Sequence, residues 1–107
     1  VRAWYAWGER DADRAIDIME FAWERLPEQG GVNNMMGYKY MAAGNMEKAK
    51  QHFEIFMRVN PDVPNAYDSY GDYYLAAGDT AMAKEMYMGA YDLDNSWTAS
   101  KERADAL

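Results

Sequence analysis

The sequence predicts an all-α fold made of repeated helix–turn–helix units. Three observations lead to this prediction. The chain matches itself when it is shifted by 34 residues, and Gly and Pro recur where helices would end. The composition is rich in Ala, Met, Glu and Lys and has only 3 prolines, which favours helix over strand. Half of the 107 residues are apolar, enough to form the core of one small domain.

The self-similarity is clearest over residues 31–95, where the register runs without a gap. Chance rarely produces an ungapped match of this length, so the shift indicates a structural repeat. The same shift extends backwards, where Ala15 precedes Ala49. The matched pairs include Gly37 with Gly71, Tyr40 with Tyr74, Ala49 with Ala83, Phe53 with Tyr87, and Pro27 with Pro61.

The register divides the chain into three units at about 1–28, 29–62 and 63–95, followed by a capping helix at 96–107. The first unit is the least regular, and its first helix is expected to end near Ala-Trp-Gly at 6–8. Terminal repeats of an array are often atypical.

Local signals predict where the helices end. Gly44-Asn45 and Gly78-Asp79 each combine a helix-ending Gly with a side chain that can cap the next helix. Asn60-Pro61 ends the helix between them, and Pro64 suits the first turn of the following helix. The expected helices cover about 31–43, 46–58, 64–77 and 80–92, and a last helix starts at Asp94, Asn95 or Ser96 and runs to about Ala106.

Gly37 and Gly71 lie inside predicted helices, where Gly costs about 1 kcal/mol relative to Ala. This cost indicates that the missing side chain makes room for a neighbouring helix. Ala49 and Ala83 would serve the same purpose on the facing helix.

At these positions the chain resembles the tetratricopeptide repeat family, whose units are 34 residues long. The matched pairs above fit the family pattern, whereas Asn95 stands where the family favours Pro. The resemblance covers 31–95 well and 3–27 loosely. It implies a right-handed α-solenoid whose concave face is lined by the first helix of each unit. It also implies a non-catalytic protein–protein interaction module.

Mapped through the register, the resemblance implies which side chains line the concave face. Asp68 and Asp72 stand where a related subgroup uses basic residues to grip C-terminal carboxylates, so that kind of ligand is disfavoured. We expect an aromatic, acidic groove for a peptide with basic and apolar side chains; the alternative is that its Tyr and Met residues fill the core. The candidate partner-binding residues are Asn34, Tyr38, Met41, Asp68, Asp72 and Leu75, with Ala42 and Ala76 beside them.

The net charge of −7 at pH 7 disfavours nucleic acid as a partner, because an acidic surface repels phosphates. No apolar run approaches the roughly 20 residues needed to span a bilayer. With no cysteine and no targeting segment, both cytoplasm and periplasm remain open as locations.

No catalytic, cofactor or metal site is predicted. The single histidine, His52, is expected to face outward or half outward from its helix and to be structural or solvated. Asp92, Asp94 and Ser96 resemble the start of a calcium loop, but Trp97 occupies the position of the tight-turn Gly. No serine stands in a motif that would activate a nucleophile.

Two features point to a larger parent protein. The stretch 65–72, the Ala-Ala-Gly-Asp at 76–79 and the Leu-Asp-Asn at 93–95 resemble repeats at the C-termini of bacterial hydrolases, including serine hydrolases of the β-lactamase type. The alternative function is therefore a C-terminal accessory or docking domain of such an enzyme. Trp4, Tyr5 and Trp7 form an aromatic N-terminal edge that could pack on an upstream domain or form a homodimer.

Overall fold

The computed structural model describes residues 12–107, with side chains from residue 17 onward, and this part of the chain consists of six helices without strands. The predicted helix ending near 6–8 and the Trp4, Tyr5 and Trp7 edge lie outside the described residues. The division into repeat units stays a prediction. The helices are α2 (Ala12–Arg25), α3 (Gly30–Ala42), α4 (Met46–Val59), α5 (Pro64–Ala76), α6 (Thr80–Leu93) and α7 (Thr98–Asp105).

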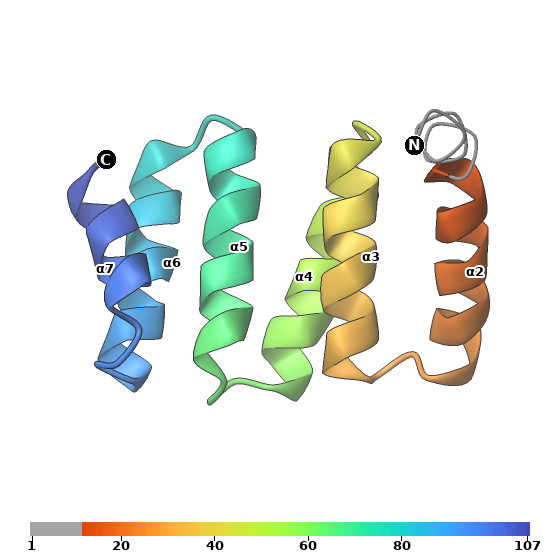
Figure 1. Ribbon diagram of the computed structural model, residues 1–107, viewed down its shortest axis with the longest axis horizontal. Coiled ribbons are helices and arrows are strands. Elements are labelled where there is room, and N and C mark those ends of the chain that lie inside the picture. Colours follow the sequence, from red (N-terminus) through yellow and green to blue (C-terminus); the bar gives the residue numbers. More distant parts are fainter. Residues whose placement is uncertain (1–11) are drawn as a thin grey trace, which may run out of the picture.

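The helices follow one another in a row from α2 to α7, each packed against its neighbours in sequence (Figure 1). The pairs α3–α4 and α5–α6 pack most extensively. Contacts of α5 with α3, and hydrogen bonds from α7 to α5, bring α3, α5 and α7 side by side. All-α stacking of helix pairs was predicted from the 34-residue repeat and is confirmed.

The predicted turn chemistry is confirmed at both Gly-containing turns. Gly44 and Gly78 adopt φ values of +83° and +84°, the left-handed region that Gly occupies without strain. The Oδ1 of Asn45 accepts from the Lys48 amide at 3.2 Å, and that of Asp79 accepts from the Met82 amide at 3.1 Å. These bonds satisfy amides that a helix start leaves unpaired.

The last helix begins later than predicted, at Thr98 rather than at residues 94–96. The reason is local: the Asp94 carboxylate accepts from the Ser96 amide at 3.0 Å and from its hydroxyl at 2.7 Å. An Asp that bonds the backbone two residues ahead stabilises a turn instead of a helix start.

Gly37 and Gly71 lie against aromatic rings of the partner helix. A Cβ on Gly37 would stand 2.6 Å from Cε1 of Phe53, and one on Gly71 would stand 2.6 Å from Cε1 of Tyr87. Both rings are fully buried, as are Ala49 and Ala83. The predicted close contact between helices is therefore present, and the atoms nearest to each of these glycines are those of the aromatic ring on the partner helix.

His52 does not face outward, and that prediction was wrong. The residue is 6% exposed, stacks on Tyr40 and meets the edge of Trp23. The side-chain amide of Asn33 donates to the carbonyls of Pro27 and Gln29, so its Oδ1 is left to accept from Nδ1 of His52 at 3.0 Å. Trp23 of α2 and Tyr40 of α3 cover a position that helical periodicity alone leaves at the edge of the apolar face.

Candidate interaction face

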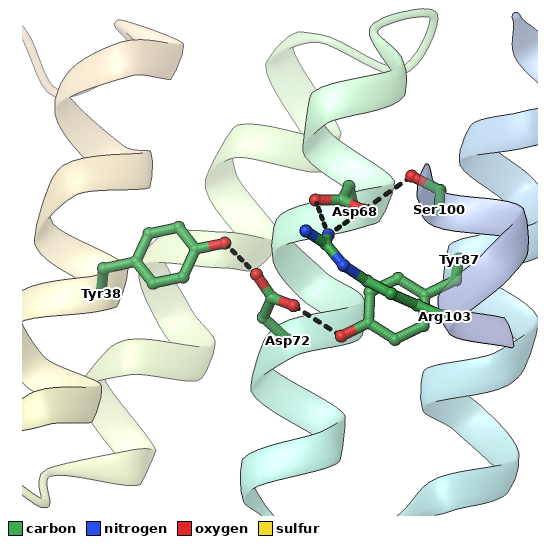
Figure 2. A network of polar contacts seen from close by, with 6 residues as sticks. All are labelled: Tyr38, Asp68, Asp72, Tyr87, Ser100 and Arg103. Atoms are coloured by element: carbon green, nitrogen blue, oxygen red, sulfur yellow. Dashed lines mark hydrogen bonds and ion pairs between the residues drawn. The ribbon is translucent and has the colours of Figure 1, made fainter. Parts of the chain in front are cut away.

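The helices α3, α5 and α7 form one face of the array, here named the inner face. The structure brings Tyr38, Asp68 and Asp72 together there (Figure 2). Side chains of α6 and α7 donate hydrogen bonds to the two carboxylates. Asn34 and Met41 are half-buried on α3, and Met41 packs against the core cluster. Leu75 is 45% exposed near the end of α5. Whether these residues contact a partner stays a prediction.

Asp72 connects three helices. Its Oδ2 accepts from the Tyr38 hydroxyl of α3 and its Oδ1 from the Tyr87 hydroxyl of α6, each at 2.5 Å (Figure 2). Burial first and the Asp72 carboxylate second raise the pKa of both tyrosines above the usual value of 10.0. Both phenols are therefore neutral donors at physiological pH, and they hold the Asp72 carboxylate in one orientation.

Asp68 lies deeper and is paired with a cation. Nη1 of Arg103 donates to both of its carboxylate oxygens at 2.9 Å, and the Ser100 hydroxyl donates to Oδ1 at 2.7 Å (Figure 2). Asp68 is 8% exposed, whereas the Arg103 side chain is 50% exposed. The Asp68 charge is the largest cause that raises the pKa of Arg103. The acid expected to face a ligand is thus covered by α7.

The two networks leave one negative charge unbalanced. Asp68 and Arg103 neutralise each other, while Asp72 receives hydrogen bonds from neutral hydroxyls only. A half-buried carboxylate without a cationic partner attracts positive charge, and it is screened less than a surface charge. The inner face is therefore anionic at Asp72.

Sequence reasoning missed Tyr87, Ser100 and Arg103 as members of this site. Tyr87 was predicted only as the repeat match of Phe53, and the last helix was treated only as a capping helix. A signal was present: Arg103 follows Asp68 by 35 residues, one repeat plus one position, so extending the register into α7 places it beside α5.

Other features of the described chain are less specific. A cavity of about 660 Å³ is lined by the C-terminal ends of α2 and α4 and by the turn after α2. Its lining includes Trp23, Arg25, Leu26, Pro27, Ile55 and Arg58. Within residues 12–107, no three His, Asp or Glu side chains come together as a metal site would require. Among the described helices, none combines the length and hydropathy of a membrane span.

Comparison with known families and structures supports the fold. Residues 64–96 match the family model described as tetratricopeptide repeat. A thermophilic TPR protein from Thermus thermophilus superposes with a TM-score of 0.84 at 18% identity, over 92% of this chain and 50% of that one. This chain thus spans about half the length of the Thermus protein. A search of curated proteins found no match.

Two further similar structures are individual TPR domains. The Sgt2 TPR domain from Aspergillus fumigatus has a TM-score of 0.79 and 23% identity, over 95% of this chain and 69% of that one. The other is the first TPR domain of Spaghetti (RPAP3), bound to the HSP90 peptide SRMEEVD. It has a TM-score of 0.74 and 17% identity, over 94% of this chain and 83% of that one. The described helices therefore have the tetratricopeptide repeat fold. The resemblance to hydrolase C-termini is not shown by these matches and stays a prediction.

Proposed function

We propose that this chain is a non-catalytic interaction module that binds a peptide segment of a partner protein on its inner face. The observation that carries the proposal is the unbalanced charge of Asp72, whose carboxylate accepts from Tyr38 of α3 and Tyr87 of α6. A half-buried carboxylate attracts a cationic side chain because its charge is screened less than a surface charge. Support also comes from the TPR fold, which in the Spaghetti structure carries a bound peptide.

The chemistry of the inner face favours a basic and apolar segment. Asp72 attracts a cationic side chain, and the exposed Leu75 with the half-buried Met41 offers apolar surface. An acidic tail would meet like charge at Asp72. Because Arg103 neutralises Asp68, the face should hold one strong position for a cation rather than the two that the pair of Asp residues predicts.

Fluorescence anisotropy tests the proposal with two labelled peptides of equal length, one of Leu and basic residues and one of Leu and Glu. We expect only the basic peptide to bind, and Asp72→Asn to weaken it about tenfold, the value of one charge-assisted hydrogen bond. Asp92→Asn is the matched control, since Asp92 is exposed on α6 and the substitution removes the same charge. Equal weakening by both variants, or preference for the acidic peptide, would contradict the proposal.

A further inference from the structure

The pair of Asp68 and Arg103 shows how the inner face holds an arginine. The guanidinium reaches from α7 to α5, where Nη1 meets both oxygens of Asp68 at 2.9 Å (Figure 2). Its central carbon lies 5.8 Å from the centre of the Tyr87 ring. A carboxylate beside an aromatic ring suits the planar, multiply donating guanidinium group.

The 34-residue register carries this arrangement back by one unit, to the junction of α3 and α5. At that junction, Asn34 corresponds to Asp68 and Ser69 corresponds to Arg103. Phe53 corresponds to Tyr87. A serine is too short to fill the role of an arginine. The Oδ1 of Asn34 is buried and has no hydrogen-bond partner among the described residues. The Oγ of Ser69 is buried beside the Tyr38 hydroxyl. Unpaired buried polar atoms are uncommon in native proteins and call for an explanation.

Asp72 supplies the negative charge at the same junction. Its two oxygens accept from Tyr38 and Tyr87, which occupy two of about four acceptor positions of a carboxylate. Among the ion pairs of residues 12–107, none includes Asp72. The junction therefore offers a carboxylate and an amide oxygen as acceptors, and no described side chain forms an ion pair with Asp72. The charge of Arg103 also acts on Asp72, but its guanidinium is bonded to Asp68.

We infer that the partner inserts an arginine side chain between α3 and α5, one repeat before Arg103. This inference rests on the proposed function and specifies its ligand. The guanidinium binds Asp72, and its remaining donors turn toward Oδ1 of Asn34. Arginine is favoured over lysine because its fixed fork of five donors can serve a carboxylate and an amide oxygen at once.

Entry of this side chain requires a small rearrangement. The Tyr38 side chain spans the junction to reach Asp72, and Ser69 is only 1% exposed. Rotation of Tyr38 away from Asp72 gives up one hydrogen bond and opens the junction. A charge-assisted bond from the guanidinium to Asp72 replaces the lost one, so the exchange favours the bound state.

The test uses three labelled peptides that differ only at one central residue: arginine, lysine, or citrulline, the uncharged isostere of arginine. The flanking residues are Leu and Ser. By anisotropy, we expect the arginine peptide to bind wild-type protein about tenfold more tightly than the citrulline peptide, as for one charge-assisted hydrogen bond, and more tightly than the lysine peptide. In Asp72→Asn the difference between arginine and citrulline should disappear.

Asn34→Ala separates this inference from general attraction of positive charge. It should weaken the arginine peptide more than the lysine peptide, while Asn95→Ala, in the exposed turn before α7, should change neither. Equal affinity for arginine and citrulline, or for arginine and lysine, would overturn the inference. If the arginine and lysine peptides bound equally and Asp72→Asn weakened both, this inference would fail and the proposed function would stand. If no peptide bound, the proposed function would fail as well. Should a variant unfold, the three peptides on wild-type protein still decide.

Discussion

Replacing Gly37 by Ala should destabilise the fold, although Ala is the better helix former. The new Cβ would stand 2.6, 2.7 and 2.8 Å from three ring carbons of Phe53. Favourable carbon contacts lie at about 3.5–4.0 Å, so the ring must retreat by about 1 Å. Phe53 is 0% exposed, so its ring cannot move out into solvent. Overpacking costs about 1–3 kcal/mol and helix propensity returns about 1 kcal/mol, which leaves a net loss of up to about 2 kcal/mol.

Urea unfolding followed by far-UV circular dichroism measures this loss as a lower midpoint at unchanged slope. Gly31→Ala is the comparison variant, because its Cβ would meet only the exposed Gln29 side chain, whose Oε1 lies 3.1 Å away and accepts from the Val32 amide. That side chain can shift more easily than a buried ring, so this variant should lose less stability than Gly37→Ala. If Gly37→Ala were as stable as Gly31→Ala, the close contact between α3 and the Phe53 ring would be refuted.

Three further predictions concern stability. Asp79→Ala removes the cap of α6 and should cost about 1 kcal/mol in urea unfolding, and no loss would argue against the cap. Arg103→Ala leaves Asp68 buried without its cation and should lower the free energy of unfolding by about 1–2 kcal/mol after allowance for solvent screening. Lys101→Ala, which removes an exposed ion pair with Asp105, should have a much smaller effect. Equal effects of the two variants would count against the inner-face network. Burial, then the charge of Lys48, lowers the pKa of His52 below 6.5 in the folded state. The unfolded chain then binds more protons than the folded chain as pH falls through 6.5, so the free energy of unfolding should fall there more steeply in wild type than in His52→Gln.

Much of the fold could be predicted because its signals are local. A Gly with positive φ, an Asn or Asp cap and a Pro at a helix start each act within a few residues, and the structure has them at Gly44, Asn45 and Pro64. The last helix was misplaced for a local reason as well, since Asp94 was expected to start a helix and instead bonds within a turn.

The inner-face network was harder to predict because it depends on contacts between units. Periodicity placed Asp68 and Asp72 on one helix face, but it gave them equal roles. The structure separates them, since Arg103 neutralises Asp68 while two neutral tyrosine hydroxyls hold Asp72. The burial of His52 was missed for the same reason, because it results from contacts with Trp23 of α2 and with Tyr40 and Asn33 of α3.

The anionic face and the cavity near α2 give two distinct places where a peptide could bind. They lie on different parts of the array: the first is built on α3, α5 and α7, and the second on the ends of α2 and α4. Trp23 and Ile55 mark the cavity, whereas Tyr38 and Asp72 mark the inner face. A method that reports on each residue separately can therefore distinguish the two sites.

The most direct test of the account is a titration of isotope-labelled protein with the arginine-containing peptide, followed by amide chemical shifts in heteronuclear NMR spectra. Binding at the inner face predicts that the largest shift changes lie at Asn34, Tyr38 and Asp72 and are lost in Asp72→Asn. Changes that centre instead on Trp23 and Ile55, and that persist in Asp72→Asn, would place the peptide in the cavity and contradict the proposed role of the inner face.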